Sequence, residues 1–146
     1  MGTDGPGVIL VGVDGSPTSL RAAAYAAGLA RRQHARLVAV YVHQPPIAAA
    51  LATPSGAAVT AAARQAGQEI EADLRQALHR YARTWGIDGC LVVRAGDPVT
   101  VLTDLATEAH ADAIIVGSSA SVARRIAGSV GTRLVRTRRW PVTVVP

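Results

Sequence analysis

The chain has 146 residues, of which 49% are hydrophobic and 17% are charged, and this balance excludes a disordered chain and fits one folded domain. The chain has no Phe and only 3% aromatic residues, so aliphatic side chains must fill the core, and a stacking platform for single-stranded nucleic acid is not expected. The net charge is +5, and all the positive charge of the side chains comes from arginines, because the chain has no Lys. This charge favours an anionic partner.

Short apolar runs rich in Val and Ile alternate with segments in which apolar residues recur at helical spacing. In chain order they predict strand 8–13, helix 17–34, strand 37–42, helix 68–85, strand 90–94, helix 98–109, strand 113–116, a helix starting near 130 and strand 142–145. In the last helix, Val130, Leu134 and Val135 are expected to face inward. Residues 47–67 are Ala-rich and show no clear period at their start, which predicts a mobile connection into the second helix.

This alternation predicts a mostly parallel α/β sheet with helices on both faces. Ligands of such folds bind at the carboxyl ends of the strands, near the point where the strand order reverses. Three segments are therefore candidates for a binding site: Asp14, residues 42–44, and the loop that starts at Gly117.

The single cysteine, Cys90, excludes an intrachain disulfide, and its apolar surroundings in the sequence predict a small buried side chain. No secretory signal is apparent, and no apolar run approaches the roughly 20 residues that span a bilayer. We therefore expect a cytoplasmic protein without a membrane segment.

Motifs of the common nucleotide-binding and catalytic folds are missing from the sequence. The turn Asp14-Gly15-Ser16 lacks the GxGxxG pattern, and no GxxxxGK[ST] motif occurs. No nucleophile elbow, paired carboxylates or metal-ligand spacing accompanies His43, the one histidine near the predicted site. We expect His43 to be a surface or loop residue, and the protein to be no enzyme.

The segment from Gly117 to Val130 is a small-residue loop that leads into a predicted helix. Backbone N–H groups at a helix start bind phosphate, Ser129 could add its hydroxyl, and Arg124 and Arg125 could neutralise charge. The alternative is structural, with Gly117 allowing the strand to turn and Ser129 capping the helix. The spacing leaves both hypotheses open.

The basic residues are unevenly distributed along the chain. Six arginines lie within residues 113–146, where no Asp or Glu occurs, so the first 112 residues carry a net charge of −1. A basic end of this kind suits phosphate or another anion, although a solvated helix face gives the same pattern. We expect Arg133 to Arg139 to form such a solvated face.

Six motifs fall in order and at consistent separations along the chain. They are Val-Gly-Val-Asp-Gly-Ser at 11–16, Tyr41-Val42-His43-Gln44-Pro45-Pro46, Gly96-Asp97-Pro98, residues 111–118, Gly128-Ser129-Val130, and residues 141–145. Together they resemble the universal stress protein family, and the resemblance covers residues 8 to 146. It implies an open five-stranded α/β sheet of strand order 3-2-1-4-5 in a single domain, which agrees with the predicted alternation.

The resemblance also implies that ATP or AMP binds across the strand ends, where Mg²⁺ could accompany ATP. The implied adenosine contacts are Gly12, Val13, Asp14, Val42, Val116 and Gly117. The implied phosphate contacts are Gly128, Ser129 and Val130, and the predicted site is completed by Ala120, Arg124 and Arg125.

The phosphate loop of the family follows the pattern G-x2-G-x9-G-[ST], and this chain departs from it. Ala120 occupies the second glycine position, and seven residues rather than nine separate it from Gly128. Alanine is costly where a glycine has positive φ, and a shorter loop surrounds an anion less fully. We therefore expect the adenosine half of the site to be the better preserved half.

Three functional hypotheses follow, in order of expectation. The first is a regulatory or stress-response protein that binds an adenine nucleotide. The second is a dimerisation or partner-binding member of the same family that binds no nucleotide, and the third is a nucleic-acid binder that acts through its arginines. A homodimer is expected because the strand of Val142, Thr143, Val144 and Val145 would lie at a sheet edge and because the resemblance implies one.

Overall fold

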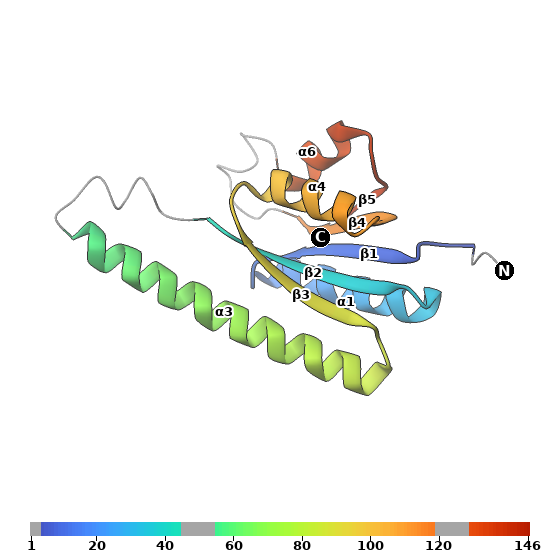
Figure 1. Cartoon of the computed structure of the whole chain (residues 1–146), viewed down its shortest axis with the longest axis horizontal. Coiled ribbons are helices and arrows are strands. Elements are labelled where there is room, and N and C mark those ends of the chain that lie inside the picture. The colour runs from blue at the N-terminus through green and yellow to red at the C-terminus, as the bar shows by residue number, and fades with distance from the viewer. Residues whose placement is uncertain (1–3, 45–54, 119–128) are drawn as a thin grey trace.

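The computed structural model describes residues 4–44, 55–118 and 129–146, which form one layered α/β arrangement (Figure 1). The elements follow the order β1 (Val8–Val13), α1 (Pro17–Gln33), β2 (Arg36–His43), α3 (Gly56–Trp85), β3 (Gly89–Ala95), α4 (Pro98–Glu108), β4 (Ala113–Gly117), α6 (Val130–Thr137) and β5 (Val142–Val145). All the predicted strands are therefore present, with ends that differ from the prediction by one residue at most.

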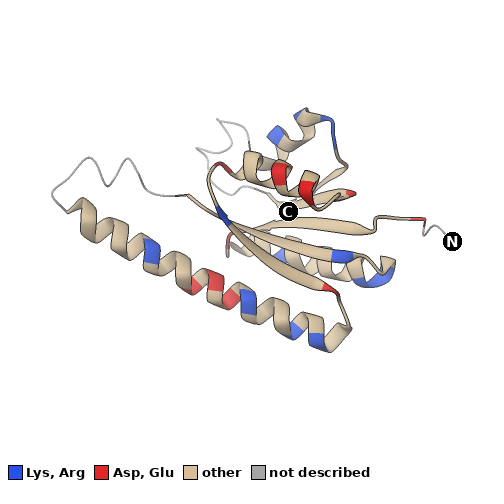
Figure 2. Ribbon diagram, in the orientation of Figure 1, with Lys and Arg blue, Asp and Glu red and all other residues tan. Residues whose placement is uncertain are grey.

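The five strands form a single sheet of order β3-β2-β1-β4-β5, in which every neighbouring pair is parallel. This confirms the predicted strand order of 3-2-1-4-5. Helices α1 and α3 cover one face of the sheet, and α4 and α6 cover the other (Figure 1). Charged residues lie on the helices and near the strand ends, whereas the middle of the sheet is uncharged (Figure 2).

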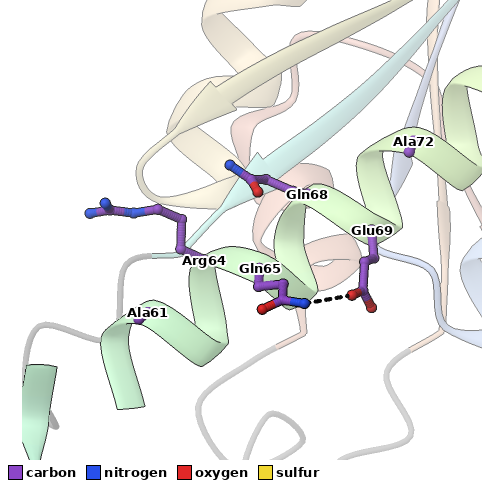
Figure 3. A pocket seen from close by; sticks show the side chains of 6 residues that line it. All are labelled: Ala61, Arg64, Gln65, Gln68, Glu69 and Ala72. Carbon is purple, nitrogen blue, oxygen red and sulfur yellow. Dashed lines mark hydrogen bonds between the residues drawn. The ribbon is translucent and has the colours of Figure 1, made fainter. Parts of the chain in front are cut away.

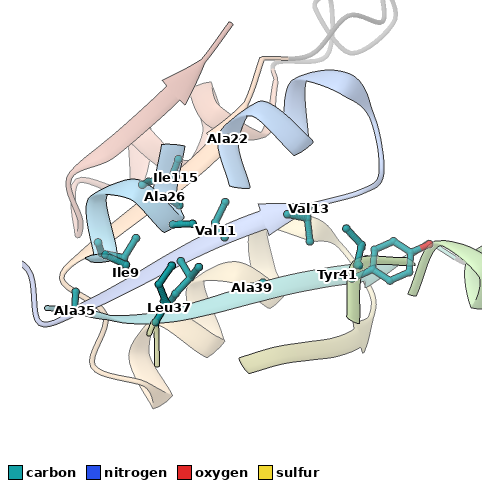
Figure 4. Close-up of a cluster of buried hydrophobic side chains, with 14 residues drawn as sticks. Ile9, Val11, Val13, Ala22, Ala26, Ala35, Leu37, Ala39, Tyr41 and Ile115 are labelled. Atoms are coloured by element: carbon teal, nitrogen blue, oxygen red, sulfur yellow. The ribbon is translucent and has the colours of Figure 1, made fainter. Parts of the chain in front are cut away.

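Successive residues of each strand point to opposite faces of the sheet, as the pleat requires. In β1, Ile9 and Val11 are fully buried beneath α1 (Figure 4). Leu10, between them, is fully buried beneath α4. Helix α1 faces the sheet with small residues that include Ala22 and Ala26, so it can lie close to the strands. Close approach of backbones thus replaces bulky aromatic side chains in this core.

Three helices begin at the carboxyl edge of the sheet with a polar residue that caps them. The caps are Ser16 for α1, Asp97 for α4 and Ser129 for α6, and each side chain accepts a hydrogen bond from the backbone N–H three residues later. Such caps satisfy N–H groups that have no partner within the helix.

Among the described helices, none has the length and apolar character of a membrane span.

Helix α3 begins at Gly56, so the prediction of a connection up to residue 67 is wrong for residues 56–67. Residues 47–54 lie outside the described part of the chain. The segment is rich in Ala, the strongest helix former, but it buries only Gly56 and Gly67 and therefore carries no apolar stripe. With 30 residues, α3 is about 45 Å long, so its first turns extend past the ends of the strands (Figure 1).

Two expectations about burial also need correction. Leu134 of α6 is fully buried, but Val135 is 55% exposed, because a helix of only eight residues presents one narrow face to the sheet. Cys90 is half-buried rather than buried.

Candidate functional site

Three strands end close together at the carboxyl edge of the sheet. β1 pairs with β4 through Val11 and Ile115, and each of these strands ends two residues further on, at Val13 and Gly117. β2 extends past the level of Val13 by two residues, so Val42 lies at the same edge. The structure therefore brings together the strand-end residues that the sequence predicted for the adenosine half.

The α4 side of this edge is apolar. Val42 and Val116 belong to the cluster of side chains that packs under α4. Gly12 lies beneath the same helix, where an added Cβ would be 3.4 Å from both Leu102 and Val116. The Val116 side chain is buried, so Gly12 and Val42, which are half-buried, are the residues of this group that a flat, weakly polar ring such as a nucleobase could reach.

Gly117 is required by packing. A Cβ at this position would lie 2.6 Å from the carbonyl carbon of Thr18 and 2.7 Å from the backbone nitrogen of Ser19. Backbone atoms at the start of a helix cannot move aside as a flexible side chain can. The structure therefore gives Gly117 a packing role, which lets α1 begin directly against β4, rather than the turn that the sequence suggested.

Asp14 lies in a tight turn between β1 and α1. Its Oδ1 accepts a hydrogen bond from the Ser16 N–H at 2.9 Å, and its own N–H donates to Ser19 Oγ at 3.1 Å. The intervening Gly15 has a φ of +81°, which favours glycine, and it lies against Ile70 of α3. The exposed carboxylate of Asp14 is thus held in a fixed turn at the carboxyl edge.

The start of α6 lies against the end of β4. An added Cβ at Gly131 would be 2.7 Å from Val144 Cγ2 and 3.5 Å from Val116 Cγ2, so the first turn packs directly on the sheet. Ser129 Oγ accepts from the Thr132 N–H at 3.2 Å, which confirms the capping role left open for this residue.

Four of the predicted phosphate residues, Ala120, Arg124, Arg125 and Gly128, lie outside the described residues. Ser129 and Val130 are described, and both are half-buried. The described phosphate half therefore consists of the start of α6 and its cap.

A second contact joins the start of α6 to the start of α4. Arg133 donates from its two terminal nitrogens to the two carboxylate oxygens of Asp97, at 3.0 and 3.1 Å. These hydrogen bonds, followed by one from the Thr100 N–H, lower the pKa of Asp97 to about 2. The arginines of this segment are exposed, as the sequence predicted, but Arg133 is paired with Asp97 and Arg139 lies over the Trp140 ring at 4.4 Å.

The end of β2 contacts α3 through His43. Its ring lies 4.5 Å from the Tyr41 ring, and its Nε2 is 3.7 Å from Glu71 Oε2. An added Cβ at Gly67 would be 2.8 Å from the His43 ring, so this glycine allows the helix to pass close by. The expectation of a surface or loop histidine is wrong, because His43 is a half-buried strand residue between two elements.

Tyr41 shows the electrostatic consequence of this arrangement. Burial raises the pKa of its phenol, and the negative charges of Asp14 and Glu71 raise it further. The phenol therefore stays neutral and keeps its O–H over the whole physiological pH range.

A hollow of about 540 Å³ lies along the first half of α3 (Figure 3). The described residues that line it are Ala61, Arg64, Gln65, Gln68, Glu69 and Ala72. Gln65 donates to Glu69 at 3.3 Å, one turn further along the same helix. None of these lining residues belongs to the predicted site, and no group of three or more His, Cys, Asp or Glu in the described ranges is arranged to hold a metal ion.

The sequence did not predict the contributions of Glu71, Gly67, Asp97 and Arg133 to this edge. In the sequence, Asp97 was recognised as part of the Gly96-Asp97-Pro98 motif before a helix, and Arg133 as one member of a basic segment. Nothing in the order of residues signals the contact between them, which joins positions 36 residues apart.

Comparisons with known proteins agree with this geometry. The model of the universal stress protein family matches residues 7–146. A universal stress protein of Methanocaldococcus jannaschii is 28% identical over 140 residues, which cover 94% of this chain and 80% of that protein.

Two solved structures extend the comparison to three dimensions. A crystal structure of a universal stress protein family member from Burkholderia pseudomallei is 30% identical, with a TM-score of 0.71 and 96% of each chain covered. A universal stress protein crystallised in complex with cAMP is 26% identical, with a TM-score of 0.65 and 97% of each chain covered.

Proposed function

We propose that this chain, which belongs to the universal stress protein family, binds an adenine nucleotide at the carboxyl edge of β1, β2 and β4. The observation that carries the proposal is the convergence of Val13, Val42 and Gly117 with the capped start of α6. The related universal stress protein crystallised with cAMP supports an adenine nucleotide as the ligand class.

In the adenosine half, the half-buried Gly12 and Val42 at the strand ends would contact the base, while the Val116 side chain stays in the core beneath them. Asp14 would accept hydrogen bonds from the ribose hydroxyls, because an ionised carboxylate only accepts hydrogen bonds and a nucleoside offers several donors. The turn that fixes Asp14 restrains this carboxylate before a ligand arrives, which lowers the entropy lost on binding.

In the phosphate half, the first turn of α6 would face the phosphate groups. Its early N–H groups have no acceptor within the helix, and the helix dipole is positive at this end. Ser129 and Val130 lie at this start, as the proposal requires. With ATP, phosphate oxygens and water would bind Mg²⁺, as they do where few carboxylates are near.

We assign a binding role without a chemical step to this site. His43, at the end of β2, contacts Tyr41 and Glu71, and we assign it no role toward the ligand. The proposed natural ligands are ATP and AMP. Binding of the nucleotide would change the contacts of this protein with its partners, in line with a regulatory or stress-response role.

Calorimetric titration of the full chain with ATP, AMP, cAMP and adenosine tests the proposal. We expect saturable binding of at least ATP or AMP, and about tenfold weaker binding by Asp14→Asn, because the amide keeps the turn but loses a charged acceptor. The matched control is Asp88→Asn, which makes the same change at the opposite edge of the sheet. Absence of binding at millimolar nucleotide, with no nucleotide released from the denatured protein, would leave the dimerisation module as the better hypothesis.

We also propose a homodimer through β5. This strand pairs with β4 on one side and ends the sheet on the other, and Val144 is 45% exposed. Uncovered edge strands pair readily, and a lysine on the edge opposes such pairing. Light scattering should therefore show a monomer for Thr143→Lys and a dimer for the control Thr84→Lys. A dimer that persists both in Thr143→Lys and after removal of residues 141–146 would contradict this interface.

A further inference from the structure

We propose that Asp97 and Arg133 are positioning residues that hold the start of α6 for phosphate recognition. They would thereby set the preference of the site for phosphorylated ligands over adenosine. This inference rests on the proposed function, and it concerns the contact between α4 and α6, to which that function alone assigns no role.

Asp97 is fixed by several donors at once. Its Oδ2 accepts from the Thr100 N–H at 3.0 Å and from the Thr100 hydroxyl at 3.1 Å, which anchors the carboxylate to the first turn of α4. The guanidinium of Arg133 then binds both oxygens in a two-pronged, charge-assisted contact. This geometry fixes the direction as well as the distance between the two side chains, which a single hydrogen bond does not.

Arg133 is attached to the cap of α6 through its backbone. Its N–H donates to the Ser129 carbonyl at 3.0 Å, and this bond is the first turn of the helix. The side chain of Arg133 therefore links Asp97 of α4 to the residue that caps α6. A displacement of Arg133 would move Ser129 and Val130 with it.

Helix α6 depends on such external contacts. It has only eight residues, and a helix of this length is not stable in water without packing. Gly131 and Leu134 hold it against the sheet, but both contacts are apolar and nondirectional. The contact with Asp97 is the directional one among the described contacts of α6 with other elements.

The charge balance separates this role from direct phosphate binding. Asp97 neutralises the Arg133 guanidinium, so the attraction of the α6 start for phosphate comes from its N–H groups and its dipole. If Arg133 bound phosphate directly, Asp97 would compete with the ligand, and its removal would tighten ATP binding. If Arg133 positions the helix, removal of the Asp97 charge weakens ATP binding. The two roles therefore predict effects of opposite sign.

Titration of the full-length chain with ATP, AMP and adenosine tests the inference in Asp97→Asn, Arg133→Gln and Arg133→Lys. Asparagine is as good a helix cap as aspartate, so α4 keeps its start while the charged contact is lost. We expect about fivefold weaker binding of ATP and AMP by Asp97→Asn and Arg133→Gln, the most that an exposed ion pair permits, and adenosine binding within about twofold of the wild type. Arg133→Lys should restore part of the loss, because lysine keeps the charge but not the two-pronged geometry.

Asp88→Asn again serves as the matched control, and thermal unfolding confirms that each variant is folded. The inference is overturned by tighter ATP binding in Asp97→Asn, by equal weakening of ATP and adenosine, or by no change at all. A wild-type chain that binds none of the three ligands overturns the proposed function and this inference together. If the wild type binds the nucleotides and the variants keep its ratio of ATP affinity to adenosine affinity, this inference alone is overturned.

Discussion

The two halves of the candidate site are built in different ways. In the adenosine half, Gly117 lies against the backbone of Thr18 and Ser19 with no space for a Cβ. In the phosphate half, a two-turn helix is held by the Ser129 cap and by an ion pair whose side chains are 43% and 42% exposed. One half therefore depends on packed backbone, and the other on polar contacts open to water.

This difference determines how each half responds to change. A Cβ forced into packed backbone costs about 1 to 3 kcal/mol or more, whereas loss of a helix cap costs about 1 kcal/mol and an exposed ion pair contributes less. A change at the packed backbone of the adenosine half, at Gly117, should therefore affect the whole fold. Changes in the phosphate half should alter ligand preference in a protein that remains folded.

The largest effect is expected for Gly117→Ala. The new Cβ would lie 2.6 Å from the Thr18 carbonyl carbon, so α1 or β4 must shift, and the free energy of unfolding should fall by about 3 kcal/mol. Urea unfolding measures the loss. The control is Gly12→Ala, whose Cβ would meet flexible side chains at 3.4 Å and should cost less than about 1 kcal/mol. Equal free energies of unfolding for the two variants would show that the backbone contact at Gly117 does not make this position more sensitive than Gly12.

A smaller effect is expected when the caps of the two halves are removed in turn. Ser16→Ala and Ser129→Ala each delete a side-chain acceptor for a helix N–H, and each should lower the free energy of unfolding by about 1 kcal/mol. Only Ser129→Ala should lower the affinity for ATP relative to adenosine, because only this cap lies in the phosphate half. Calorimetry measures the affinity of each variant for ATP and for adenosine. The same ratio of the two affinities in both variants would contradict the division of the site into two halves.

The adenosine half could be predicted from the sequence because its positions are the ends of strands. Each apolar run ends at a residue that breaks it, so Val13, Val42 and Gly117 were placed without any tertiary information. The strand order needed the resemblance to the family, since alternation alone does not say which strands are neighbours. The first turns of α3 were missed because an exposed Ala-rich helix has no apolar stripe to reveal its period.

The phosphate half was only partly predictable. Ser129 was recognised as a possible cap, and the structure confirms the cap, while its contact with phosphate stays a prediction. The pairing of Asp97 with Arg133 could not be foreseen, because it depends on how α4 and α6 pack on the same face of the sheet. A basic segment in a sequence does not show which of its arginines already has an acidic partner.

The smallest effect is expected from the titration of Asp97. Its pKa in the folded chain is about 2, lowered from 3.8 chiefly by Arg133, so folding favours the ionised form. The stabilisation is complete above about pH 4 and is lost as the pH falls towards 2, and solvent screening keeps it below about 1 kcal/mol. Between about pH 5 and pH 3, the free energy of unfolding should therefore fall less for Asp97→Asn than for the wild type. Arg133→Gln should show the same reduced fall, because it removes the group that lowers the pKa. Urea unfolding at both pH values measures the difference, and parallel losses in all three proteins would mean that this contact does not stabilise the phosphate half.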